Sequence, residues 1–161
     1  MTLRPSGYGA GVRSTARVLA ALGTALVVLL GGGCAPQSPD HNSWTDQARQ
    51  ALEDTASQVA TVALLLRLER ENKVPGKYQQ VVAQDSESAV GATMAKFGGE
   101  QPEPRDDATY KRVTSLMSDA SDLVSEVRIA IVRRDSDEYP KLLDQLEELD
   151  RKLTQAADGL R

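Results

Sequence analysis

The sequence has very few of the residues that carry most catalytic and redox chemistry. Its 161 residues include one cysteine, Cys34, and one histidine, His41. A lone cysteine forms no internal disulfide, so the folded part must be stable without one. His41 lies beside prolines with no second ligand nearby, which predicts a solvated side chain. A histidine-based triad and a thiol protease both need a histidine beside a nucleophile, and the sequence excludes both classes.

Aromatic residues and positive charge are also scarce. The chain has one Trp, one Phe and four Tyr, and all 23 acidic residues follow Cys34, where only 16 of the 19 basic residues lie. This part therefore carries a formal charge of −7, which argues against binding to nucleic acid or to anionic lipid. It would suit a basic partner or simple solubility. Its many Ala, Leu and Val residues, mixed with charged ones, are typical of helices that pack through aliphatic side chains.

One long apolar run is present, from Val18 to Leu30. Arg4, Arg13 and Arg17 precede it, and three glycines and Cys34 follow it. The run is about 13 residues long, whereas a helix needs roughly 20 apolar residues to cross the hydrocarbon core. This order of charge, apolar run and small residues predicts an export signal instead of a permanent transmembrane anchor.

The same stretch resembles the signal and lipobox of bacterial lipoproteins, with Gly32 and Gly33 just before Cys34. In that family the cysteine thiol receives a diacylglyceryl group and the signal is cut just before it. Two acyl chains are enough for stable anchoring. The chain also has the look of small helical lipoproteins of actinobacteria, which implies a lipid anchor on the outer face of the cytoplasmic membrane. Gly31 stands where the family usually has leucine, and secretion after cleavage at Ala35 is the alternative.

The organisation that follows is a signal peptide over 1–33, a lipidated cysteine and tether over 34–42, and a helical domain over 43–161. Ser43 is predicted to cap the first helix. Trp44 is predicted to cover the open end of the domain, and the alternative is that it lies against lipid headgroups near the tether. Proline and glycine breaks divide the domain into four helices, predicted over residues 43–73, 76–97, 106–134 and 136–159. We expect an all-α fold, an antiparallel up-and-down four-helix bundle.

Apolar residues mark one face of three of these helices. In the first, third and fourth helices they recur at alternating spacings of three and four, which places them on one stripe. The second helix has only a thin stripe, interrupted by an aspartate; it is formed by Tyr78, Val81, Val82, Asp85, Ala89, Ala92 and Ala95.

Four residues are candidates for ligand binding. Tyr78, Tyr110 and Tyr139 each fall at the start of a helix, where aromatic rings could line a small pocket. Alternating helices start at opposite ends of a bundle, so at most two of the three meet, and core packing is the simpler alternative. Asp85 is the fourth, as a carboxylate on a nominally buried stripe, and a slight rotation of the helix would bring it to water. Neither a Glu-x-x-His pair nor a calcium loop is present, so we predict no metal and no cofactor.

The leading hypothesis is a non-enzymatic, membrane-tethered protein-interaction or structural module of the cell envelope. It would be held through lipid on Cys34 and would present a bundle face to an envelope protein. An exposed apolar stripe, especially around Ala51, Ala63 or Leu116, would support it. The alternative is an extracytoplasmic sensor or binding protein for a small molecule, which needs an enclosed pocket. A small envelope enzyme is the third hypothesis and needs converging carboxylates in a cleft.

Overall fold

A computed structural model describes residues 40–161 except 72 and 101; the predicted signal peptide and Cys34 lie outside these residues. In the described part all regular structure is helical and no strand is present. Two short 3-10 turns, η1 (Pro104–Asp106) and η2 (Ser136–Glu138), precede the last two helices. The four long helices are α2 (His41–Arg70), α3 (Gly76–Gly98), α4 (Asp107–Arg133) and α5 (Tyr139–Asp158).

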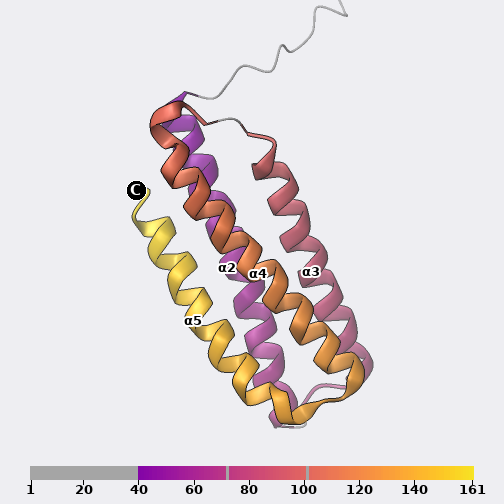
Figure 1. Ribbon diagram of the computed structural model, residues 1–161. Helices are drawn as coiled ribbons and strands as arrows, with labels where there is room; N and C mark the ends of the chain where they lie inside the picture. The colour runs from indigo at the N-terminus through magenta and orange to yellow at the C-terminus, as the bar shows by residue number, and fades with distance from the viewer. Residues whose placement is uncertain (1–39, 72, 101) are drawn as a thin grey trace, which may run out of the picture. The chain divides into compact units, whose positions relative to one another are not determined.

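The four helices form an antiparallel up-and-down bundle, as the sequence predicted (Figure 1). Each helix runs back along the one before it. Helix α2 packs against all three others, and α4 packs against α3 and α5. The ion pair between Arg67 and Glu147, with 2.7 Å between Nη2 and Oε1, further joins the end of α2 to α5.

The helix breaks follow from local chemistry. Pro75 is the residue before α3, where it ends the preceding connection without removing a helical hydrogen bond. Pro140 falls in the first turn of α5, where its missing amide costs little. Arg134 ends α4 with φ 58° and ψ 38°, and its N–H donates to the carbonyls of Ala130 and Ile131. Such a left-handed residue satisfies carbonyls that a helix end would otherwise leave free.

Helix α2 starts earlier than the sequence suggested. Its N-cap is Asp40, whose Oδ1 accepts a hydrogen bond from the backbone N–H of Ser43 at 2.8 Å. The prediction that Ser43 caps this helix was therefore wrong, because the carboxylate three residues earlier takes that role. His41 consequently belongs to the first turn of α2 instead of to an unstructured tether.

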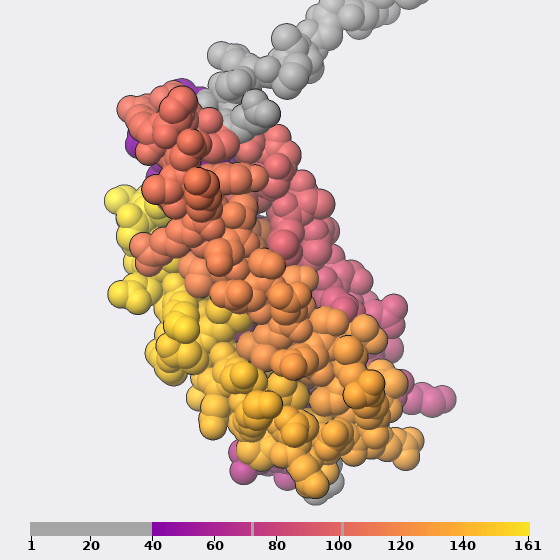
Figure 2. All heavy atoms as spheres, in the orientation of Figure 1, coloured from indigo at the N-terminus to yellow at the C-terminus, as the bar shows by residue number. Residues whose placement is uncertain are grey.

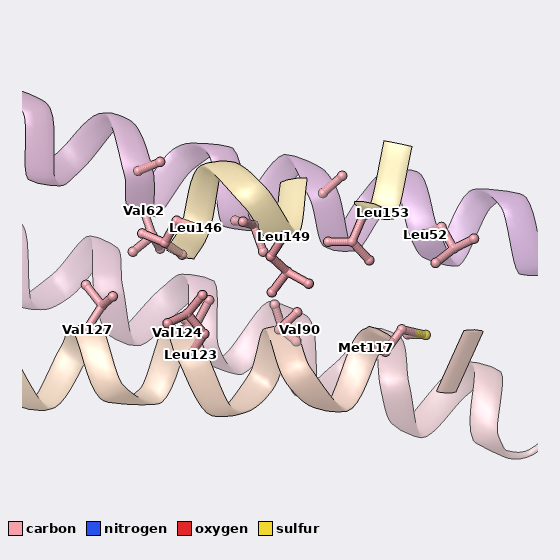
Figure 3. Close-up of a cluster of buried hydrophobic side chains, with 14 of the residues drawn as sticks. Leu52, Val62, Val90, Met117, Leu123, Val124, Val127, Leu146, Leu149 and Leu153 are labelled. Carbon is pink, nitrogen blue, oxygen red and sulfur yellow. The ribbon is translucent and has the colours of Figure 1, made fainter. Parts of the chain in front are cut away.

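The core is aliphatic and runs the length of the bundle. Figure 3 shows leucines of α5, among them Leu146 and Leu153, pointing toward Val62 of α2, Val124 of α4 and Val90 of α3. All five are completely buried. Burying one such side chain adds about 1.5–3 kcal/mol to the free energy of unfolding. The stripes predicted for α2, α4 and α5 are thus confirmed as the inner faces of these helices.

The stripe predicted for α3 was displaced by one residue, although its member Val82 is partly buried and packs against the core. Tyr78 and Val81 are 59% and 54% exposed, and Asp85 is also exposed. The residues that do face the core are Gln79, Ala83, Ser86, Val90 and Phe97. Moving one residue along a helix rotates the face by about 100°. The physical reason is that α3 packs against the other helices through the face that carries Val90 and Phe97. These two large apolar side chains are buried there, although the same face also carries polar Gln79 and Ser86.

Candidate functional site

The four residues singled out from the sequence do not form one site. Tyr78 and Asp85 lie exposed on α3. Tyr110 lies at the other end of the bundle, partly buried, with its ring centroid 5.7 Å from that of Phe97. Tyr139 alone is both buried, at 3% exposure, and part of a pocket wall. The expectation that at most two of the tyrosines meet is consistent with this, because Tyr78 and Tyr139 share an end of the bundle but only Tyr139 lines the pocket.

The pocket at Tyr139, which we call the end pocket, lies where α3 and α5 begin and α4 ends. It has a volume of about 720 Å³, and Lys77, Gln79 and Arg134 also contribute to its lining. Helix α3 starts there without any side chain that caps its free amides. Burial raises the pKa of the Tyr139 hydroxyl, and the negative charges of Glu69 and Asp135 add to the rise. The end pocket therefore combines the cationic Lys77 and Arg134, the acidic Glu69 and a tyrosine whose pKa is raised.

A second hollow lies between α4 and α5, and we call it the α4–α5 groove. Its volume is about 700 Å³. Figure 2 shows the face of the molecule on which α4, in orange, and α5, in yellow, lie side by side. Its apolar lining comes from Leu123 and Ile129 of α4 and Leu149 of α5. Leu123 and Leu149 are nearly buried, whereas Ile129 remains 37% exposed.

The rim of the α4–α5 groove is strongly acidic. Its carboxylates are Asp119, Asp122, Glu126, Asp144 and Glu148, and its only cation is Lys152. Glu148 forms ion pairs with Arg151 and Lys152. Within the described residues, the other four carboxylates have no cation within ion-pairing distance. The groove therefore presents two rows of largely uncompensated negative charge, with the nearly buried Leu123 and Leu149 between them and the exposed Ile129 continuing the α4 row three residues after Glu126.

Local sequence explains this arrangement. Asp119, Asp122 and Glu126 follow one another at spacings of three and four, so they form a row along α4. Asp144 and Glu148 form a similar row along α5, four residues apart. Sequence reasoning interpreted these acids as solvent-facing charge and missed the groove. The signal that was available is that two consecutive helices each carry an acidic row beside the apolar stripe.

The exposed apolar stripe that would support the interaction-module hypothesis was expected around Ala51, Ala63 and Leu116, and it is absent there. Ala51 and Ala63 are buried in the core and Leu116 is partly buried against it. The large apolar side chains that are exposed lie elsewhere, and in the described residues they are Leu64, Tyr78, Val81, Ile129 and Val132. Of these, only Ile129 lines the α4–α5 groove.

The end of the bundle where α2 begins is tied together by polar and aromatic contacts. His41 Nδ1 lies 3.0 Å from both carboxylate oxygens of Asp106, whose side chain is almost fully buried. The ring of Trp44 packs at 5.9 Å from that of Phe97, and Trp44 is 1% exposed. The prediction of a solvated His41 was thus incomplete, since its partner lies 65 residues away in sequence. Trp44 is part of the core at this end, where it was expected to cover the bundle.

Other kinds of site find little support in the described part of the chain. Within residues 40–161, apart from the two undescribed positions, no three His, Cys, Asp or Glu side chains converge on a point where a metal ion could sit. Of the helices described there, none has the length and apolarity needed to span a bilayer. The sequence shows no match to a protein-family model, to a curated protein or to a solved structure. Function is therefore inferred from the arrangement of the chain's own side chains.

Proposed function

We propose that this protein is a membrane-tethered, non-enzymatic interaction module of the cell envelope, and that its docking surface is the α4–α5 groove. The observation that carries the proposal is the groove itself. It combines five carboxylates with the exposed apolar side chain of Ile129, which lies in line with the acids of α4. Surfaces with an apolar centre and a charged rim are typical of protein-binding sites.

The tether is proposed on sequence grounds. The signal-like run and the glycines before Cys34 support cleavage and lipidation of that cysteine. One diacylglyceryl group supplies the two acyl chains that stable anchoring requires. The lipid would hold the bundle at the outer face of the cytoplasmic membrane, and an envelope protein in or near the same membrane would then meet it at a raised effective concentration.

Crosslinking in intact cells tests this function. A photoreactive amino acid is placed at Gln145, an exposed position that lines the groove, and in a matched strain at Ser57, an exposed position on α2. We expect one discrete crosslinked envelope protein from the Gln145 strain and none from the Ser57 strain. Replacing Cys34 with Ala should remove the protein from the membrane fraction and abolish the crosslink. Equal crosslinking from both positions, or none from the groove in a membrane-bound protein, would overturn the proposal.

A second candidate function is the binding of a small polar molecule in the end pocket. The observation that favours it is Tyr139, a residue only 3% exposed that lines the 720 Å³ pocket together with Lys77 and Arg134. Among the described residues the Tyr139 hydroxyl has no hydrogen-bond partner, so a ligand atom or water can accept from it.

Thermal-shift measurements with the twenty amino acids and common organic acids test this second function. A true ligand should raise the melting temperature of the wild-type protein and lose most of that effect in Tyr139→Phe. The matched control is Tyr110→Phe, which removes a tyrosine hydroxyl at the opposite end of the bundle. Stabilisation that survives Tyr139→Phe unchanged would rule out the end pocket as its source.

A further inference from the structure

The lining of the end pocket also indicates the chemical class of its ligand, an inference that rests on the second candidate function. The pocket lies at the lower end of the bundle in Figure 1, where α2 and α4 end and α3 and α5 begin. Its lining carries charge of both signs, from Glu69, Lys77 and Arg134. The ion pairs near this end join other side chains, namely Arg67 with Glu147, Lys73 with Glu71 and Lys141 with Glu138. Among the described residues the three charges of the pocket are therefore unpaired.

Two polar side chains that are more than nine-tenths buried also line the end pocket. Tyr139 is 3% exposed and Gln79 is 8% exposed. Gln79 Nε2 donates to the carbonyl of Val74 at 3.0 Å, which leaves Oε1 as a free acceptor. In the described residues Trp44 Nε1 is the only side-chain nitrogen or oxygen that is both fully buried and unpartnered. The Tyr139 hydroxyl and Gln79 Oε1 must therefore stay accessible to solvent, and the pocket is the solvent-filled space that both residues border.

The α3 side of the end pocket suits a carboxylate. Helix α3 begins without a side-chain cap, and the N–H of Lys77 in its first turn has no hydrogen-bond partner among the described residues. Free amides at the start of a helix bind anions, because they point at the ligand and the helix dipole favours negative charge. The side chains of Lys77 and Arg134 add two cations at the same pocket.

The α2 and α5 side suits an ammonium group. Burial raises the pKa of Tyr139, and the charges of Glu69 and Asp135 add to the rise, so the Glu69 carboxylate lies close enough to act on the hydroxyl. An ammonium has three donors and no acceptor. The Glu69 carboxylate, the Tyr139 hydroxyl and Gln79 Oε1 are acceptors that line the same pocket, and a carboxylate makes the stronger, charge-assisted bond.

Other ligand classes fit less well. A simple anion would meet Glu69, and an organic cation would meet Lys77 and Arg134, so like charges would oppose each of them. Within the described residues no group of three acidic, His or Cys side chains is placed to hold a metal ion. An apolar ligand would find few partners, because Ile131 is the only aliphatic side chain among the described residues of the lining.

We propose that the end pocket binds a small zwitterion, an amino acid or a dipeptide, with its ammonium beside Glu69 and Tyr139. The carboxylate of the ligand lies at the start of α3, with Lys77 and Arg134 as its partners. The pocket volume of about 720 Å³ falls within the roughly 300–1,000 Å³ of small-molecule sites and accommodates a dipeptide.

Calorimetric titration of the full-length protein in detergent micelles, with micelles alone as the blank, tests the proposal. The probes are the twenty amino acids and the twenty dipeptides that begin with alanine. Each is offered as the zwitterion, as the N-acetyl form without the ammonium, and as the amide without the carboxylate. We expect saturable binding of at least one zwitterion. Its N-acetyl and amide forms should bind at least about tenfold more weakly, because each loses a charge-assisted hydrogen bond.

Charge-neutralising variants assign the two ends of the ligand. Glu69→Gln should weaken binding of the zwitterion at least about tenfold, and should bind the N-acetyl form about as well as the zwitterion. Lys77→Gln combined with Arg134→Asn should weaken it similarly, and should no longer distinguish the zwitterion from the amide. Asparagine is chosen at Arg134 because it tolerates the left-handed backbone found there.

Matched controls remove the same charges at this end of the bundle but outside the pocket lining. They are Asp137→Asn and the pair Arg70→Gln with Arg133→Gln, all at exposed positions. Both should leave binding within about twofold. Equal losses in the controls and in the pocket variants would show that the overall charge of this end attracts the ligand, and would overturn the proposal.

The outcomes separate this inference from the second candidate function. Failure of every zwitterion to bind, or binding that does not distinguish the N-acetyl and amide forms, would overturn the inference. A ligand of a single charge whose binding depends on Tyr139 would keep the end pocket as a binding site and reject the zwitterion. If no ligand depends on Tyr139, both are rejected.

Discussion

The inner face of α3 is best tested by two chemically identical substitutions, Val90→Ala and Val81→Ala. The apolar pattern in the sequence places Val81 on the buried stripe, whereas in the structure Val90 is 0% exposed and Val81 is 54% exposed. Both lie inside the same 23-residue helix, so local helix chemistry is matched. The pair therefore isolates the effect of burial.

The expected magnitudes differ clearly. Val→Ala at Val90 removes two buried methyl groups, worth about 0.8 kcal/mol each. The cavity left in the core adds to this loss. Ala is the better helix former by about 0.5 kcal/mol. The net loss at Val90 is about 2 kcal/mol. At Val81 less than half of the side chain is buried, so less than half of this burial energy is lost. The gain in helix propensity offsets that loss, and the free energy of unfolding should change by less than about 0.5 kcal/mol.

Urea denaturation provides the measurement. Unfolding is followed by circular dichroism at 222 nm and by the fluorescence of Trp44, the only tryptophan in the chain. Coincident transitions by the two probes would support a two-state analysis. If Val81→Ala lowers the free energy of unfolding as much as Val90→Ala or more, the buried face of α3 would be the one that the sequence pattern indicated, and the face seen in the structure would be wrong.

Three further predictions concern the core and two titrating groups. Leu146→Ala should cost about 3 kcal/mol, because Leu146 is completely buried between α2 and α4; a loss below about 1 kcal/mol in urea denaturation would contradict this packing. Desolvation by itself would raise the pKa of Glu87, but the hydrogen bonds from Arg128 and Ser125, together with the charge of Arg128, outweigh it and lower the pKa. A lowered pKa gives stability that is present above the unfolded value of about 4.3 and is lost as pH falls through the folded value. Glu87→Gln should therefore cost about 1 kcal/mol at pH 7 and almost nothing near pH 3, and a difference that does not shrink with acid would oppose it. The raised pKa of Tyr139 gives stability that is present below pH about 10 and is lost as pH rises through the folded value. Tyr139→Phe should remove this part of the alkaline destabilisation, whereas Tyr110→Phe should not.

The sequence predicted three of the four inner faces correctly because those faces are almost entirely apolar, with Thr55 of α2 as a buried polar residue among them. In α5, Leu142, Leu146, Leu149 and Leu153 recur at spacings of three and four, and such a stripe has only one stable orientation, toward a core. In α3 two candidate faces compete. One carries Tyr78 and Val81 and the other carries Val90 and Phe97, so the pattern alone does not decide between them.

The candidate site was harder to foresee than the fold. Tyr139 was identified because aromatic residues at helix starts are conspicuous in a chain with few of them. The acidic rows of the α4–α5 groove were interpreted as ordinary solvent-facing charge, because a single helix gives no sign of what lies beside it. Only when α4 and α5 lie side by side do Asp122 and Asp144 border the same hollow.

The sequence by itself determined where the helices of this bundle start and stop, apart from a few residues at the ends, because proline, glycine and capping groups act through the nearest neighbours in the chain. It also determined the apolar faces of α2, α4 and α5. The tertiary structure decided the rotation of α3, the pairing of His41 with Asp106 and the shape and charge of the α4–α5 groove. These features depend on contacts between helices that are far apart in sequence, and the total packing of all four helices, not the pattern of any one, selects them.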